Sequence, residues 1–342
     1  MDLTKIKEMN SLVTPEVLAN QLGIQLKTLW GLYHLASKDL TADFCAAMPY
    51  KRLEIKTTSK VREVYSPCDR IRDIQSMLLT TVWSGIDSGE HSAAYESGMH
   101  LTDAGSKLQN HGLIVGLDFK NFFHSILKRM VFNLLIEYGY PNRTANLIAV
   151  LSCVRDNHRQ FLPQGGISSA QIANRVAASI IDPVVIKYCE ANANGAYTYV
   201  RYSDNIYIGM DSKVTGVDFL KGLASELYSN KWRTHKKRVM PYYKRQKLLG
   251  MVVNVKPNAP RDEYNKFLCA INNIANCSTK QEVQDNINKI ADLGIEVSSG
   301  KGILLLSILG KAAYYKTILN PNRVIKLLNI LEKAKNNIER MI

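Results

Sequence analysis

The segment YTYVRYSDNIYIGM, residues 197–210, constrains the fold of this chain more than any other stretch. Apolar and aromatic residues flank the polar triplet Ser203-Asp204-Asn205 on both sides. This pattern predicts two antiparallel strands joined by a tight turn, with Asp204 at the tip of the hairpin. The alternative is an ordinary turn with no chemical role, because aspartate and asparagine favour turns for conformational reasons.

A second segment, LIVGLDF at residues 113–119, predicts a buried strand that ends close to Asp118. A buried carboxylate is unfavourable unless it is paired or binds a cation, and the alternative is a strand end exposed to solvent. Asp118 and Asp204 on adjacent strand ends would share two magnesium ions roughly 3.5–4 Å apart. That arrangement suits in-line transfer of a phosphoryl or nucleotidyl group.

The remaining periodicity alternates between helical and extended segments and predicts an α+β fold. A strand hairpin is expected at residues 51–66, turning near 57–60, and a single strand at 248–255. Helices are expected over residues 14–38, 69–84, 123–139, 170–190 with an interruption at Pro183, 217–229, and from about 259 to the end.

Residues 14–38 have the cadence of a helix-turn-helix, with Thr14-Pro15 at its start and Gly23 at its turn. We interpret them as a packed pair of helices at the edge of a larger domain. A DNA-reading module is the alternative. Lys27 is the one basic residue of the second helix before Lys38, which favours the packed pair.

The chain is basic, with 44 lysines and arginines against 30 acidic residues, a net charge of +14 and a pI near 9.4. Such an excess favours a polyanionic partner. Residues 231–247 contain eight basic residues and no acidic one, with aromatic rings interleaved. This stretch predicts a nucleic-acid track, and a solvated charge run is the alternative for any single lysine. The candidate contacts are Trp232, Lys236, Lys237, Lys244 and Arg245.

Three features that are absent from the sequence indicate the cellular compartment of the protein. The six cysteines form no CxxC pair, which argues against a zinc ribbon and favours reduced thiols. The N-terminus has no apolar signal-peptide core, and the longest apolar run, residues 303–309, is too short to span a bilayer. We therefore expect a cytoplasmic protein without a membrane partner.

Five motifs, in order over roughly residues 50–270, resemble reverse transcriptases, in particular the retron-type enzymes of bacteria and related defence-associated enzymes. GLDFKNFFHSI is similar to the first catalytic block, FLPQGGISSAQIAN to the LPQG block and YVRYSDNIYIG to the YxDD hairpin. KVREVYSP resembles the fingers segment, and YKRQKLLGMVVNV resembles the stretch with a VTG-like triplet that leads into the thumb.

The resemblance implies a right-hand polymerase with fingers, a palm of antiparallel sheet and helices, and a helical thumb. The corresponding ranges are residues 1–50 for an N-terminal helical segment, 51–112 for the fingers, 113–255 for the palm with a fingers insertion at about 130–165, and 256–342 for an RNA-binding thumb. It implies an RNA-directed DNA polymerase that copies a dedicated, structured noncoding RNA into DNA from deoxynucleotides, in anti-phage defence with an effector protein. The oligomeric state stays open.

The resemblance also assigns roles to individual residues. Asp118 and Asp204, with the Phe119 carbonyl, would hold the two Mg²⁺ ions. Phe123 would be the aromatic gate against a ribose 2′-hydroxyl, with a core position as its alternative and Phe122 as the core member of the pair. Lys60 and Arg62 would grip the triphosphate, Gln164 and Gly165 would lie beneath the nucleotide, and Lys236 and Lys237 would lie near the active site.

Asn205 departs from the pattern, because the family has a second aspartate at this position of the hairpin. Its amide carbonyl can still offer an oxygen to a metal, so Asn205 remains a candidate metal ligand and catalytic residue. It adds no negative charge, however, so metal affinity should be lower. The first hypothesis is an active magnesium-dependent polymerase. The alternative is a catalytically silent RNA-binding scaffold that holds a defence effector.

Overall fold

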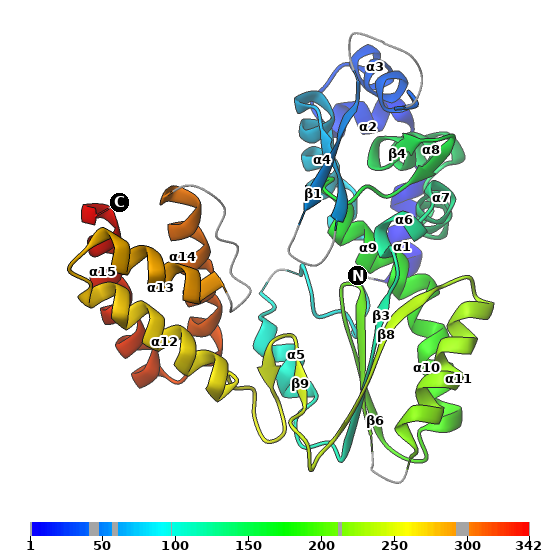
Figure 1. Cartoon of the computed structure of the whole chain (residues 1–342). Coiled ribbons are helices and arrows are strands. Elements are labelled where there is room, and N and C mark those ends of the chain that lie inside the picture. The colour runs from blue at the N-terminus through cyan, green and yellow to red at the C-terminus, as the bar shows by residue number, and fades with distance from the viewer. Residues whose placement is uncertain are drawn as a thin grey trace. The chain divides into compact units, whose positions relative to one another are not determined.

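The computed structural model of the chain describes residues 2–40, 48–56, 61–96, 98–210, 214–291 and 301–341 (Figure 1). The chain divides into two compact units. The first comprises Met1–Met99 and Val115–Val239, and the second comprises His100–Ile114 and Met240–Ile342. The second unit thus combines residues 100–114 with residues 240–342. The ranges expected for the fingers, palm and thumb stay predictions.

A four-stranded sheet with the strand order β6–β7–β3–β8 lies in the first unit. Its strands are β3 (Leu113–Phe119), β6 (Tyr197–Tyr202), β7 (Asn205–Met210) and β8 (Thr234–Pro241). The predicted strand at 113–119 and the predicted hairpin at 197–210 are confirmed. The sequence did not predict β8, because residues 235–239 are exposed and mostly basic, without the apolar alternation of a half-buried strand.

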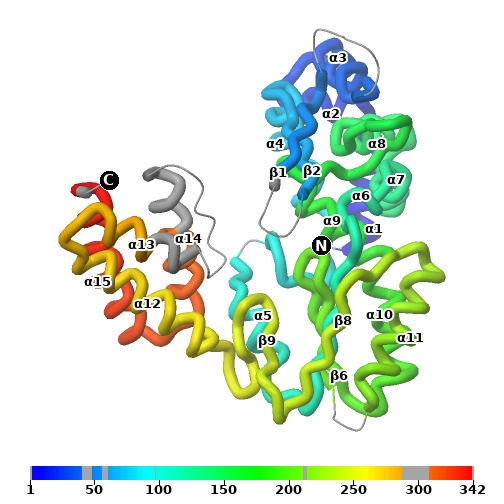
Figure 2. The backbone as a smooth tube through the Cα atoms, viewed as in Figure 1, coloured from blue at the N-terminus to red at the C-terminus, as the bar shows by residue number. Residues whose placement is uncertain are grey.

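Two helices, α10 (Asp182–Asn192) and α11 (Gly216–Ser229), lie side by side along the sheet (Figures 1 and 2). Their apolar residues are buried, among them Val185, Leu220 and Leu223. Alternate strand residues such as Ile206 and Ile208 are buried as well. The sheet therefore has one face covered by helices, as expected for an α+β palm.

The rest of the first unit is largely helical. It contains α1 (Leu3–Ser11), α2 (Pro15–Gln21), α3 (Leu26–Ala36), α4 (Asp69–Thr81), the short 3-10 helix η1 (Trp83–Gly85), α6 (Phe122–Ser125), α7 (Lys128–Glu137), α8 (Asn142–Ser152) and α9 (Ser169–Ile180). Two antiparallel hairpins accompany these helices. They are β1 (Tyr50–Lys56) with β2 (Val61–Pro67), as predicted, and β4 (Val154–Asp156) with β5 (Arg159–Phe161).

The predicted helix-turn-helix is formed by α2 and α3. Thr14 caps α2, since its hydroxyl accepts a hydrogen bond from the Val17 N–H at 3.3 Å. Gly23 has a φ of +66°, and the next N–H, of Ile24, reaches back to the Ala19 carbonyl at 3.0 Å. This bond closes the helix end in the way that a glycine makes favourable. Both helices pack against α8, which supports the packed-pair interpretation.

Two predicted long helices are each broken into two. The helix expected at 123–139 is interrupted because Ile126 is extended and Leu127 pairs with Phe161 of β5. The helix expected at 170–190 breaks at Pro183, as predicted, and the second piece begins at Asp182. Proline has no N–H to donate, so it fits the first turn of α10 and not the interior of one long helix.

The described residues of the second unit form helices and one very short hairpin. Its helices are α5 (Leu101–Lys107), α12 (Arg261–Asn276), α13 (Lys280–Ala291), α14 (Lys301–Ile318) and α15 (Pro321–Met341), and its strands are β9 (Lys247–Leu248) and β10 (Met251–Val252). The expected single strand at 248–255 is wrong. Leu249 and Gly250 both have positive φ and turn the chain back on itself, which is the backbone of a two-residue hairpin turn.

No helix in the described ranges combines the length and the apolar character that crossing a membrane requires. The cysteines in those ranges are free thiols, as the sequence predicted: Cys68, Cys153, Cys189, Cys269 and Cys277.

Candidate active site

The hairpin of β6 and β7 places Asp204 beside the end of β3. Tyr202 pairs with Asn205, so Ser203 and Asp204 are the two residues of the turn. Ser203 has a φ of +56°, which is unusual for a residue with a side chain and accommodates the tight reversal. The Phe119 N–H donates to the Asp204 carbonyl at 2.9 Å. Asp118, one residue earlier, is thereby brought to the same edge of the sheet.

The charge of Asp118 acts on the carboxyl of Asp204. Burial, and next the negative charge of Asp118, raise the pKa of the Asp204 carboxyl above its ordinary value. Hydrogen bonds from the backbone and from the Asn205 amide, with the charge of Arg62, act in the opposite direction without cancelling the rise. Two carboxylates that repel each other in a partly buried position favour a cation between them.

Asn205 takes part in this arrangement as a donor. Its side-chain N–H donates to the Asp204 Oδ1 at 2.9 Å. A narrow depression in the sheet face is lined by Asp118 and Asn205 together with basic side chains. The remaining lining residues are Gly116, Leu117, Tyr207, Lys236 and Arg238.

The oxygen donors at this edge fit a divalent cation held by two carboxylates. Within the described ranges there is no cluster of three or more His, Cys, Asp or Glu side chains, in agreement with an amide at position 205. The available donors are the carboxylates of Asp118 and Asp204, the side-chain carbonyl of Asn205 and the backbone carbonyl of Phe119. Hard cations prefer such oxygen ligands, and a cation there would offset the repulsion between the carboxylates.

The LPQG segment is held against β2. The Tyr65 N–H donates to the Gln164 carbonyl at 2.8 Å. Gly165 has a φ of +115°, and a Cβ there would lie 2.8 Å from the Tyr65 carbonyl oxygen and 2.8 Å from Val64 Cγ1. Only glycine fits such a conformation and approach. Arg62, on the same strand, is close enough for its charge to act on Asp204.

A buried glutamine fixes the far end of the LPQG segment. The Gln75 Oε1 accepts from the Ile167 N–H at 3.1 Å, and its Nε2 donates to the Leu151 carbonyl at 3.0 Å and to the Tyr50 hydroxyl at 2.7 Å. This role of Gln75 was not predicted from the sequence. Lys60, the other residue predicted to bind the triphosphate, lies outside the described residues.

An aromatic cluster lies under the end of β3. Phe119, Phe122 and Trp232 are almost fully buried, and the Trp232 ring lies 5.8 Å from that of Phe119 between centroids. The prediction that Trp232 stacks on nucleic acid is therefore wrong, because both ring faces are inside the core. Phe122 is the core member of its pair, as expected, and Phe123 is half-buried. The role of Phe123 as a gate against the ribose hydroxyl stays a prediction.

The predicted basic contacts fall in different places. Lys236 and Lys237 are both exposed on β8. Lys236 lines the same depression as Asp118. Because successive residues of a strand point to opposite faces, Lys237 points away from this depression. Arg238, two residues beyond Lys236, lines the same depression and was not singled out from the sequence. Lys244 and Arg245 belong to the second unit, where Arg245 pairs with Asp262 at 2.7 Å.

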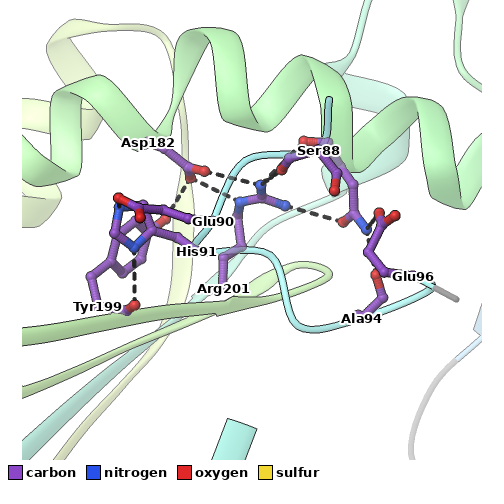
Figure 3. A network of polar contacts seen from close by, with 9 residues as sticks. Ser88, Glu90, His91, Ala94, Glu96, Asp182, Tyr199 and Arg201 are labelled. Carbon is purple, nitrogen blue, oxygen red and sulfur yellow. Dashed lines mark hydrogen bonds and ion pairs between the residues drawn. The ribbon is translucent and has the colours of Figure 1, made fainter. Parts of the chain in front are cut away.

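A buried polar network underlies the hairpin (Figure 3). The Arg201 guanidinium, fully buried, donates to the two carboxylate oxygens of Asp182 at 2.8 and 3.0 Å and to the Asn174 Oδ1 at 3.1 Å. Tyr199 donates its hydroxyl to Asp182 at 2.7 Å. Burial opposes the charge of Arg201, but the hydrogen bond and charge of Asp182 outweigh it and raise its pKa. The network joins α9, α10 and β6.

The sequence did contain a signal for this network. An arginine inside an otherwise apolar strand needs a buried acidic partner, because an unpaired buried charge is strongly unfavourable. Asn174 lies on α9 and Asp182 on α10, the two helices that precede the hairpin, but sequence spacing alone does not show which carboxylate meets Arg201.

Carboxylates at a strand end and at an adjoining hairpin turn, on an antiparallel sheet covered by helices, define the palm of a right-hand polymerase. No family model matches the chain. Its sequence is similar to the retron Ec86 reverse transcriptase of Escherichia coli, 23% identical over 256 residues, covering 71% of this chain and 74% of the relative. The chain is thus related to the retron-type reverse transcriptases.

Further similar proteins differ in length from this chain. The retron Mx65 reverse transcriptase of Myxococcus xanthus is 24% identical, and the chain covers 52% of it; for retron Mx162 of the same organism the values are 23% and 59%. Among solved structures, Candida albicans telomerase has a TM-score of 0.45 at 10% identity, covering 85% of this chain and 58% of that one. A foamy viral protease-reverse transcriptase has a TM-score of 0.39 at 14% identity, covering 86% and 44%.

Proposed function

We propose that the chain is an RNA-directed DNA polymerase that copies a dedicated structured RNA into DNA. The observation that carries the proposal is the juxtaposition of Asp118 and Asp204, whose mutual repulsion contributes to the raised pKa of Asp204. The sequence relatives are reverse transcriptases, which supports the same assignment.

Two magnesium ions are the cofactor that this donor set suits, held by Asp118 and Asp204 with Phe119 and Asn205 as neutral oxygen donors. When bound, magnesium lowers the pKa of an attacking hydroxyl and neutralises charge on a leaving pyrophosphate. The protein would position the reactants. Arginine binds phosphate with paired hydrogen bonds, so Arg62 is suited to the triphosphate of an incoming nucleotide.

The surroundings of the carboxylates suit a deoxynucleotide. Gly165 lets the LPQG backbone lie directly against β2, the strand that carries Arg62. This packed backbone would support the base of an incoming nucleotide. Phe123 is half-buried one residue after a core phenylalanine and would exclude a ribose 2′-hydroxyl by steric contact. Lys236 and Arg238 place positive charge on the same sheet face, suited to the backbone of a bound strand.

A specific observation favours a second candidate, the silent scaffold. Asn205 removes one negative charge from the edge and satisfies Asp204 without any cation. A chain that had lost catalysis would keep the basic surface and bind RNA together with an effector protein. Anti-phage defence in the cytoplasm is the setting we propose for either candidate.

The test is DNA synthesis by the protein purified with its bound nucleic acid, in magnesium and labelled deoxynucleotides. Wild type would be compared with Asp118→Ala and Asp204→Ala, and with Asp218→Ala as a control carboxylate, since Asp218 is exposed on α11. We expect RNase-sensitive incorporation that falls to about a hundredth or less in both site variants and is unchanged in the control. Bound RNA without any incorporation by wild type would favour the scaffold.

A further inference from the structure

A segment before β3 forms an extra strand-like contact on the outer edge of β6. The Arg201 N–H donates to the His91 carbonyl at 2.7 Å, and the Ala93 N–H donates to the Arg201 carbonyl at 2.8 Å. Ser92 and Arg201 are thereby paired in a parallel bridge. The segment runs in the same direction as β6, so Tyr95, three residues after Ser92, lies toward the end that carries Asp204, three residues after Arg201.

Tyr95 is held in an unfavourable backbone conformation with its ring in solvent. Its φ is +61°, a region that bulky residues rarely adopt, and the residue is 52% exposed. Positive φ in a tyrosine is a strained arrangement of the kind that gathers at functional sites.

The strain persists because Asn174 fixes both neighbours of Tyr95. The Asn174 side-chain N–H groups donate to the Ala94 carbonyl and, at 3.1 Å, to the Glu96 carboxylate. Asn174 is itself fully buried and bonded to Arg201. A single buried amide thus joins the loop that presents Tyr95 to the strand that carries the hairpin.

We propose that Tyr95 is a nucleic-acid contact, stacking its ring on a nucleobase next to the catalytic hairpin. This role rests on the proposed function, since it places nucleic acid at that hairpin. An exposed ring on a residue whose two neighbours are fixed is suited to stacking, because every base presents an aromatic face. The Arg201–Asn174 network ties the residues on either side of Tyr95 to β6, the strand that leads to Asp204. Asn174 and Arg201 are therefore positioning residues.

The experiment measures binding of an RNA template–DNA primer duplex with a single-stranded template overhang, by fluorescence anisotropy without magnesium. Tyr95→Asn removes the ring, and asparagine tolerates positive φ better than other residues with a side chain. Tyr95→Phe keeps the ring. Tyr228→Asn is the matched control, because Tyr228 is an exposed tyrosine on α11 at 65% exposure.

We expect Tyr95→Asn to raise the Kd about 5- to 100-fold, while Tyr95→Phe and Tyr228→Asn stay within about twofold. The melting temperature of Tyr95→Asn should be equal to or above that of wild type, which a purely structural role would not produce. A Kd for Tyr95→Asn within twofold of wild type, equal weakening by Tyr95→Phe, or no duplex binding by wild type would overturn the proposal. Primer extension, measured separately, tests the polymerase function itself. If Tyr95→Asn weakens duplex binding but wild type extends no primer, the polymerase function is overturned and the role of Tyr95 in binding stands.

Discussion

The Asn205 amide donates a hydrogen bond of 2.9 Å to the Oδ1 of Asp204. An aspartate at position 205 would instead add a third negative charge beside Asp118 and Asp204. The amide therefore stabilises the cation-free hairpin and weakens its attraction for magnesium. Stability without magnesium and affinity for magnesium can both be measured in the variant Asn205→Asp.

Asn205→Asp should bind magnesium more tightly and be less stable without it. The added carboxylate attracts a divalent ion, but in its absence it replaces a hydrogen bond by repulsion. We expect a lower magnesium concentration for half-maximal synthesis, a change in maximal rate below tenfold, and a lower melting temperature in EDTA. A variant that gains synthesis from an inactive wild type would instead support the silent scaffold.

Asp204→Asn should stabilise the metal-free protein at neutral pH while removing synthesis. The pKa of Asp204 is raised in the folded chain, so folding favours the protonated carboxyl. The resulting loss of stability is absent below the unfolded-state pKa, about 3.9, and develops as pH rises through the folded-state pKa. The melting temperature of the variant in EDTA should exceed that of wild type at pH 8, and this margin should disappear as the pH falls to the unfolded-state pKa. A variant that is less stable at pH 8 contradicts this account.

Arg201→Met should strongly destabilise the first unit. It leaves the Asp182 carboxylate buried with only the Tyr199 hydroxyl as its side-chain partner, and breaking such a pair on one side costs about 3–5 kcal/mol. Arg72→Met is the control, since Arg72 pairs with Asp69 on the exposed side of α4 and such pairs contribute about 0–1 kcal/mol. Urea unfolding gives both values, and equal losses in the two variants would argue against a special role for the network.

Gly165→Ala should reduce both stability and nucleotide use. A methyl group there meets the Tyr65 carbonyl, and a residue with a side chain in this backbone conformation costs about 1–3 kcal/mol. Gly31→Ala is the contrasting change, because Gly31 lies in α3 with open space around it, and alanine favours helix by about 0.5–1 kcal/mol. We expect a lower melting temperature and a higher KM for deoxynucleotides in the first variant and the reverse shift in melting temperature in the second. Unchanged KM and stability in Gly165→Ala would argue against a role for this backbone contact in nucleotide binding.

Local sequence patterns predicted the elements that carry the carboxylates. The strand before Asp118 and the hairpin around Asp204 follow from short apolar runs and turn residues, which act within a few positions. Pro183 and Gly23 likewise marked a helix break and a turn through backbone preferences alone. Such local rules are reliable because they need no information about distant contacts.

The features that the sequence missed depend on contacts between distant segments. Strand β8 forms beside β3 although its exposed basic residues lack an apolar face. Trp232 lies in the core because Phe119 and Phe122, more than a hundred positions earlier, provide an aromatic cluster for it. The partners of Arg201 and the strained backbone of Tyr95 are set in the same way, by tertiary packing that overrides local preference.

The sheet of the first unit is protected at its two sides by different means. On the β6 side the chain itself covers the edge through the bridge between Ser92 and Arg201. On the β8 side the outer strand carries exposed Lys236, Lys237 and Arg238. Unpaired strand edges invite pairing with another molecule, and lysines on an edge oppose it. The lysines that we propose to hold nucleic acid therefore also oppose self-association of the free protein. Neutralising their charge would leave the β8 edge open to pairing with a strand of another molecule.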